Sequence, residues 1–321
     1  MSSEIPIYLF RFIVFPGLFF TAGLGLLVSW VDRKVTARIQ WRVGPPLLQP
    51  FYDLVKLMGK ETIVPANGSH LAFLGAPLIG LAGVTLAATL LGTAVIYPQA
   101  GFTGDLVVLL YLLVLPALAV ILGGVASNSP LASVGASREM KLVLSYELPL
   151  IAIITVPLIQ MAQAEPAVEG GLLRLSTLLG YQTSNGAFAW SVSGAVALVA
   201  AIFCMQAKLA AVPFDQGEAE TEIMSGAFIE YSGAPLAIYK LTKAMMLVVM
   251  PMFLVVVLWG GFGSSTLSVL LGIGKYLVLV VLFTLLRNTN PRVRIEHAMK
   301  FFWGPVTGLA FVAIVLAIAG V

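Results

Sequence analysis

Five carboxylates in one short stretch are the residues of this chain best placed to do chemistry. Asp215, Glu218, Glu220, Glu222 and Glu230 make up a third of the 15 acidic residues, and long apolar segments precede and follow them. An acidic side chain at the centre of a bilayer costs about 2.5–3.5 kcal/mol or more, so such groups are usually retained for a function. Proton movement is the expected function, because it needs groups that change protonation.

The spacing of these acids predicts a helix that begins at Glu218. Glu218 and Glu222 would share one face of it, with Glu230 two turns further along and Glu220 roughly opposite. Like charges this close raise one another's pKa, and burial raises it again. A solvated acidic loop is the simpler alternative, but the interleaved apolar residues and the lack of a compensating basic run argue against it.

Three further ionisable residues lie in or beside apolar helices and complete the predicted proton path. Glu147 lies just inside one such helix, where it either faces the bundle interior or reaches the interface. Lys240 and Lys243 are spaced i, i+3 at the start of another helix. They either pair with Glu230 or Glu222 or extend to the membrane interface.

The composition identifies an integral membrane protein. Of 321 residues, 59% are hydrophobic and 10% are charged, and the mean hydropathy is +0.99, whereas soluble domains carry roughly 25% charged residues. The net charge of +3 is not gathered into a basic patch, so no nucleic-acid partner is expected. One cysteine and two histidines make a poor metal set. We therefore expect no metal site and no catalytic residue in this chain, and any redox chemistry belongs to partner chains.

Long apolar segments predict an all-α protein with about eight transmembrane helices, forming one transmembrane domain over residues 1–321. Thirteen Lys and Arg residues fall in the loops after the first, third, fifth and seventh segments, and only Arg174 falls in the other loops. Basic loops face the cytoplasm, so the long loops after helices 1, 3, 5 and 7 are predicted to be cytoplasmic and both termini outside. The predicted segments are 8–30, 71–97, 106–124, 143–162, 187–207, 235–259, 266–286 and 303–320.

Two cytoplasmic segments are expected to do more than connect helices. The loop at 31–70 should contain an amphipathic helix at 49–61 along the interface. Its charges and aromatic residues either anchor the membrane orientation or dock a water-soluble partner. The segment at 208–234 holds the clustered acids and is expected to be an acidic coupling loop or helix. The outside connector at 163–186 is moderately polar and carries no such signal.

Several motifs, taken in order along nearly the whole chain, resemble the H subunit of respiratory complex I, which is chain 1 of the mitochondrial enzyme. The matching motifs are Asp32-Arg33-Lys34-Val35, Arg42-Val43-Gly44-Pro45, Leu48-Gln49-Pro50, Ala126-Ser127-Asn128-Ser129, Ser145-Tyr146-Glu147, Pro213-Phe214-Asp215, Glu230-Tyr231-Ser232-Gly233 and Pro291-Arg292. Jointly they are highly specific.

The resemblance implies a membrane anchor on which a peripheral redox arm docks, at the entrance of a glutamate-lined channel toward antiporter-like subunits. It implies that the clustered acids and Glu147 are channel acids. It also implies that Asp53 and the loop arginines, with their basic neighbours, line the junction with the peripheral arm. These predicted docking residues are Arg33, Lys34, Arg38, Arg42, Asp53, Arg138, Arg287, Arg292 and Arg294.

Departures from the complex I pattern favour a narrower resemblance. Quinone-reducing members carry Glu-Thr-Asn-Arg before Pro-Phe-Asp, whereas this chain has Lys208-Leu209-Ala210-Ala211-Val212. Arg138-Glu139 is more similar to the anchor subunit of energy-converting membrane-bound [NiFe] hydrogenases and sulfane sulfur reductase complexes. The leading hypothesis is therefore an ion-translocating anchor of a ferredoxin-linked hydrogenase-type complex in the cell membrane, itself binding no cofactor. Hydrogenase-like large and small subunits and an Fe–S subunit would carry the Fe–S clusters and a [NiFe] centre.

Three other readings stay open at this point. The same fold serves a quinone-reducing complex I or a sulfur-reductase complex. A stand-alone ion-coupled carrier is disfavoured by the lack of an internal repeat. A purely structural anchor leaves the acid cluster unexplained. The sequence does not distinguish H⁺ from Na⁺ as the ion moved.

Overall fold

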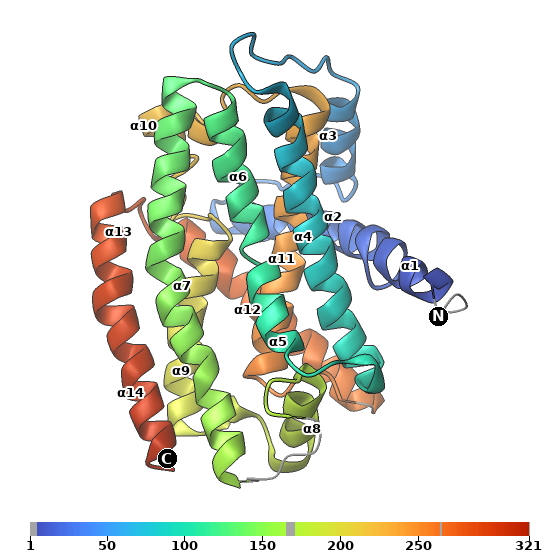
Figure 1. The fold of residues 1–321 in the computed structure, drawn as a ribbon, viewed down its shortest axis with the longest axis vertical. Coiled ribbons are helices and arrows are strands. Elements are labelled where there is room, and N and C mark those ends of the chain that lie inside the picture. The colour runs from blue at the N-terminus through green and yellow to red at the C-terminus, as the bar shows by residue number, and fades with distance from the viewer. Residues whose placement is uncertain (1–4, 165–170, 264, 321) are drawn as a thin grey trace.

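The computed structural model describes residues 5–164, 171–263 and 265–320, and every regular element within these ranges is a helix (Figure 1). Seven helical segments there are long and apolar enough to cross a membrane, and Val192–Lys208 is a shorter apolar helix. This confirms the prediction of an all-α membrane protein. The α-helices are α1 (Ile5–Ile13), α2 (Leu18–Ile39), α3 (Gln49–Met58), α4 (His70–Ile96), α5 (Asp105–Leu112), α6 (Leu115–Ala126), α7 (Pro130–Ala164), α8 (Leu175–Asn185), α9 (Val192–Lys208), α10 (Glu220–Ile223), α11 (Gly233–Val257), α12 (Thr266–Thr289), α13 (Ile295–Phe301) and α14 (Thr307–Ile318).

Five predicted spans differ in extent from the helices. The fifth begins at Val192 rather than near residue 187, and the eighth begins at Ile295 rather than near residue 303. The first is divided into α1 and α2, and α2 continues to Ile39, so the first basic residues of the loop are helical. The third is divided into α5 and α6, with Pro116 at the start of α6, a position that proline tolerates. The fourth, α7, begins at Pro130 rather than near residue 143. The loop expected to carry Arg138 is therefore mostly helix.

Two of the segments that connect the membrane helices contain helices of their own, of which one was predicted and one was not. The amphipathic helix expected at 49–61 is α3, Gln49–Met58. The connector expected at 163–186 instead contains the helix α8, although residues 165–170 lie outside the described part of the chain. Leu175 and Leu178 of α8 are completely buried. Their burial under the bundle explains why a moderately polar stretch forms a packed helix.

Small residues let the central helices approach closely. A Cβ added to Gly25 of α2 would lie 2.8 Å from backbone atoms of Ala244 on α11, and one added to Gly80 of α4 would lie 3.0 Å from Ala119 on α6. Small residues at helix contacts are typical of membrane bundles, where close backbone packing replaces the hydrophobic drive. The helices α2, α4, α6 and α11 thus form a tightly packed centre.

The two ends of the bundle differ. Figure 1 places α3 and α10 at one end, and α8 and the C-terminus at the other. The chain segments 31–70 and 208–234, which are far apart in sequence, therefore lie at the same end of the bundle. That end carries most of the predicted site residues.

Candidate functional site

The acidic segment, defined here as residues 215–230, is not a continuous helix, which corrects the expectation from the i, i+4 spacing. Only Glu220–Ile223 is α-helical, and Met224 and Ser225 then adopt positive φ angles of 50° and 75°. The N–H of Ala227 donates to the carbonyl of Gly217 at 3.3 Å. The segment therefore folds back on itself.

Contact with α7 explains this folded-back shape. A Cβ on Gly135 would lie 2.5 Å from the nitrogen of Ala227 and 2.8 Å from the carbonyl oxygen of Gly217. The backbone of the acidic segment thus rests directly on a glycine of α7, a fit that a regular helix with side chains on all faces would not allow. Tertiary packing overrides the local helical spacing.

Three acids of the segment each pair with a cation from a different element. Asp215 accepts from Arg292 at 2.8 Å, between α12 and α13. Glu218 accepts from Lys243 of α11 at 2.7 Å. Glu222 accepts from Arg138 of α7 at 2.5 Å. These contacts tie the segment to three sides of the bundle end.

The partner of Lys243 differs from the expected ones, which were Glu222 and Glu230. Glu218 lies in the turn before α10 and faces α11, whereas Glu222 lies on α10 and faces α7. Within the part of the chain that the structure describes, Glu220, Glu230 and Lys240 form no ion pair. Glu220 and Lys240 are exposed, and Glu230 is half-buried in the turn before α11.

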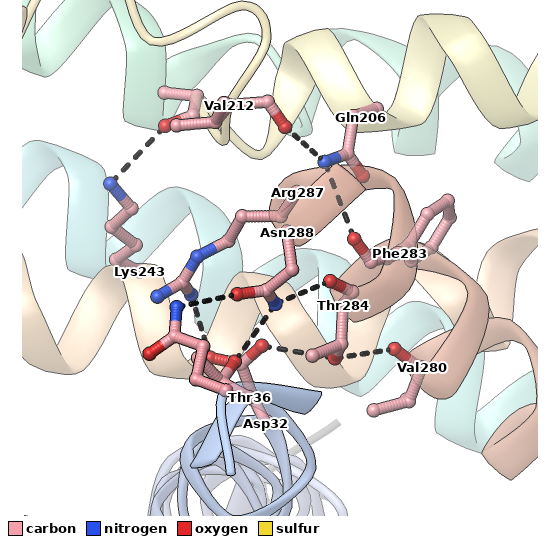
Figure 2. Close-up of polar contacts among 12 residues, drawn as sticks. Asp32, Thr36, Gln206, Val212, Lys243, Val280, Phe283, Thr284, Arg287 and Asn288 are labelled. Carbon is pink, nitrogen blue, oxygen red and sulfur yellow. Dashed lines mark hydrogen bonds and ion pairs between the residues drawn. The ribbon is translucent and has the colours of Figure 1, made fainter. Parts of the chain in front are cut away.

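A separate polar network joins α2 to α12 (Figure 2). Arg287 donates to one oxygen of Asp32 at 2.7 Å, and the hydroxyl of Thr284 donates to the other at 3.0 Å. One turn further on, Asn288 donates to the hydroxyl of Thr36 at 3.0 Å. Asp32 is 8% exposed, so two donors offset the cost of burying its charge.

The remaining predicted docking residues fall into two groups. Arg33 donates to Asp53 of α3 at 2.7 Å, and Lys34 donates to the carbonyl of Gly44 at 3.5 Å. These two contacts hold α3, and the loop that leads to it, against the C-terminal end of α2. The exposed residues, which face away from the bundle, are Arg38, Arg42 and Arg294.

The surroundings shift the pKa values of two acids at this end. The hydrogen bond from Arg33 lowers the pKa of the Asp53 carboxyl below its usual 3.8. Burial raises the pKa of the Asp215 carboxyl, and the charge of Arg292 opposes this shift. Asp215 therefore takes up a proton more readily than an exposed aspartate.

A cavity of about 490 Å³ lies between α2, α11 and the acidic segment. Two ion pairs, Asp32–Arg287 and Glu218–Lys243, line this cavity. The side chains of Phe228 and Leu247 form apolar parts of its wall. The cavity thus places the acidic segment, the C-terminal half of α2 and the start of α11 around a common space.

Two buried charged residues were not among the predicted site residues. Lys208 of α9 donates to both oxygens of Glu147 at 3.0 and 2.9 Å. Glu139 of α7 is 5% exposed and its Oε2 lies 2.6 Å from where a Cβ of Gly217 would be. Lys208 is the one basic residue at the end of its apolar segment, and this isolation was a usable signal. Glu139 follows Arg138 in a basic stretch that resembled a loop.

The described residues contain no group of three or more His, Cys, Asp or Glu side chains placed to hold a metal ion. The assignment of Fe–S and [NiFe] centres to partner chains stays a prediction. The roles predicted for the individual acids and arginines likewise stay predictions, now with defined contacts.

Comparison with known proteins gives consistent matches over nearly the whole chain. The family described as NADH dehydrogenase matches residues 12–318. The H subunit of NADH-quinone oxidoreductase from Thermomicrobium roseum is 32% identical over 311 residues, covering 91% of this chain and 90% of that protein. Formate hydrogenlyase subunit 4 of Escherichia coli is 28% identical over 304 residues, covering 91% and 94%. A chain of the archaeal membrane-bound sulfane sulfur reductase shares the fold, with a TM-score of 0.77 at 23% identity, and the match covers 98% of this chain and 100% of that one.

Proposed function

Because the chain belongs to the NADH dehydrogenase family, which includes the H subunit of complex I, we propose that it is the ion-translocating membrane anchor of a ferredoxin-linked, membrane-bound [NiFe] hydrogenase-type complex. The observation that carries the proposal is the set of ion pairs that ties the acidic segment to α7, α11 and the α12–α13 connection. A displacement of any of these elements changes the ion-pair partners of the acids.

The docking role is supported by the exposed loop between α2 and α3. Trp41 is 97% exposed and Val43 is 95% exposed, beside the cations Arg38 and Arg42. Large apolar side chains flanked by charges are typical of a protein interface. The proposed occupants are the peripheral subunits: hydrogenase-like large and small subunits and an Fe–S subunit, which would hold the metal centres. In this proposal antiporter-like subunits contact the chain within the cell membrane.

In the proposed transport role, protons move along a path formed by Glu218, Glu220, Glu222, Glu230 and Glu147. Electron transfer in the peripheral arm would move the first cytoplasmic loop and the acidic segment together. The change of ion-pair partners would then release protons along the membrane plane. The similarity to formate hydrogenlyase subunit 4 supports a hydrogenase-type complex.

The test is proton translocation by the intact complex in proteoliposomes, measured per electron transferred. The variants Glu222→Gln and Glu230→Gln should lose coupling or stop turnover. Glu296→Gln is the matched control, because Glu296 is exposed on α13 and lies outside the proposed path. Full translocation in both path variants would overturn the channel assignment. Because the Glu222–Arg138 pair is partly exposed, its loss should change folding stability by no more than about 1 kcal/mol.

A second candidate is the H subunit of a quinone-reducing complex I. The 32% identity to a quinone oxidoreductase subunit and the cavity beside Phe228 favour it. The absence of the Glu-Thr-Asn-Arg stretch before Pro213 disfavours it. Saturable binding of a quinone or a quinone-site inhibitor to the assembled complex would support this candidate over the first.

A further inference from the structure

The ion pair between Lys208 and Glu147 is unlike those at the bundle end. The Lys208 side chain is 1% exposed and the Glu147 side chain is 21% exposed, whereas the cations of the other ion pairs in the described residues are 24–45% exposed. The ammonium group therefore lies inside the bundle, and its carboxylate partner lies at the edge. This places the pair between the interior of the chain and its lateral surface.

A fixed ion pair at such a site is energetically unfavourable. Removing two charges from water carries a large desolvation cost, which their attraction offsets only in part. Transfer of one proton from Nζ to the carboxylate makes both groups neutral and removes this cost. Lysine, unlike arginine, can take part in such a transfer, because the guanidinium keeps its proton in proteins.

Other polar groups connect the pair to the acidic segment along one face of α7. The Tyr146 ring centre lies 5.5 Å from Nζ of Lys208. The Tyr146 hydroxyl is completely buried and makes no hydrogen bond to any described residue. Glu139 lies seven residues earlier, on the same face, and packs against Gly217 of the acidic segment. Cys204, one turn before Lys208 on α9, is the other ionisable side chain beside the pair.

A buried hydroxyl without a partner destabilises the fold, so Tyr146 calls for an explanation other than stability. A phenol both donates and accepts hydrogen bonds. Tyr146 shares a face of α7 with Glu139 and its ring lies beside Nζ of Lys208, so its phenol is a group on this face that could exchange a proton with these neighbours after a small rearrangement. Glu139, which packs against Gly217 of the acidic segment, and Tyr146, which lies beside Lys208, are thus both buried on this face of α7.

We propose that Lys208 carries a proton on this path, exchanging it with Glu147, rather than acting as a permanent counter-ion. In the step, an N–H bond of the ammonium breaks and an O–H bond forms on Glu147, leaving a neutral amine and a carboxylic acid. Glu147 then releases its proton at the lateral surface, and Lys208 regains one from Glu139 by way of Tyr146. The inference rests on the proposed proton path and names its buried carrier.

The deciding variant is Lys208→Arg, measured beside Lys208→Gln in the intact complex. The complex is reconstituted in proteoliposomes with reduced methyl viologen as electron donor. Arginine preserves the charge and the ion pair but cannot release the proton. Both variants should therefore lose at least ten-fold in protons moved per electron. Lys275→Arg is the matched control and should pump normally, since Lys275 donates to the carbonyl of Trp259, just beyond the end of α11 that is far from Lys243. Normal pumping by Lys208→Arg would overturn the proposal.

The same experiment separates this inference from the function on which it rests. If Glu147→Gln and Glu222→Gln lose coupling while Lys208→Arg keeps it, only the role of Lys208 is wrong. If all three pump normally, the proton path itself is wrong. Infrared difference spectra on reduction give a readout that does not depend on pumping. A carboxylic-acid C=O band should appear in the unaltered complex and be missing in Lys208→Arg and Glu147→Gln. A band of equal size in Lys208→Arg would contradict proton exchange.

Discussion

The hydroxyl of Ser232, two residues after the acidic segment, donates a 3.2 Å hydrogen bond to the carbonyl of Glu61 in the loop that follows α3. The same hydroxyl accepts from the N–H of Ile63 at 3.1 Å. The predicted docking loop and the predicted coupling segment are therefore one connected structure. A movement imposed on the loop by a peripheral subunit would reach the acids without crossing the membrane bundle.

The neighbouring glycine allows a direct test of this connection. Gly233 has φ +60°, and a Cβ there would lie 2.8 Å from the carbonyl oxygens of Lys60 and Glu61. Gly233→Ala should therefore strain the junction by about 1–3 kcal/mol, raising hydrogen exchange in residues 59–64 and in the acidic segment. Ser232→Ala should have a smaller effect, of about 1 kcal/mol.

The control for that pair is Gly274→Ala, because a Cβ on Gly274 meets no atom within 4 Å. It should leave exchange in both segments unchanged. Equal protection in Gly233→Ala and Gly274→Ala would show that the junction does not depend on the close approach.

The docking of α3 should depend on acid pH through Asp53. Since Arg33 lowers the pKa of Asp53, this ion pair stabilises the docked helix fully above the usual aspartate pKa of 3.8. Its contribution is lost as the pH falls through the lowered pKa. Carboxyl ¹³C NMR of the chain in nanodiscs, with Asp53→Asn to assign the signal, should show the low pKa. Arg33→Gln should move it toward the usual value. An unchanged titration in Arg33→Gln would exclude the ion pair in solution.

The spans and α3 were predictable from the sequence because their signals are local. Runs of about 20 apolar residues define membrane helices, and an apolar face alternating with charges defined α3. The start of α7 was not predictable in this way. Arg138 and Glu139 interrupt the apolar pattern there, yet the helix continues through them, with Gly135 packed against the acidic segment and Ala136 against Gly124 of α6.

The shape of the acidic segment and its ion-pair partners depend on contacts far apart in sequence. The i, i+4 spacing of Glu218 and Glu222 fits a helix, but backbone contact with Gly135 imposes a folded-back chain. Lys208 and Glu147 are 61 residues apart, and no local pattern links them. The sequence therefore indicated which acidic and basic residues were candidates for the site. Which of them form ion pairs could be seen only in the packed helix bundle.

The link between α2 and α12 should behave as a coupled pair. Asp32→Asn and Arg287→Gln should each destabilise the chain by about 1–2 kcal/mol, because each leaves a charged partner without its counter-ion. The double variant should cost less than the sum of the two, since removing one partner already breaks the contact. Thermal unfolding in nanodiscs measures all three. Strict additivity would mean that the two side chains do not interact.

The acidic segment should lose its position on α7 when a side chain is added at Gly135. A Cβ on Gly135 would approach the nitrogen of Ala227 to 2.5 Å, and backbone cannot rotate away as a side chain can. Gly135→Ala should therefore shift the segment and destabilise the chain by about 1–3 kcal/mol, with faster hydrogen exchange at residues 215–230. Gly180→Ala on α8, where a Cβ meets nothing within 4 Å, is the matched control and should leave both measurements unchanged. Identical melting and exchange for the two variants would mean that the acidic segment does not rest on α7.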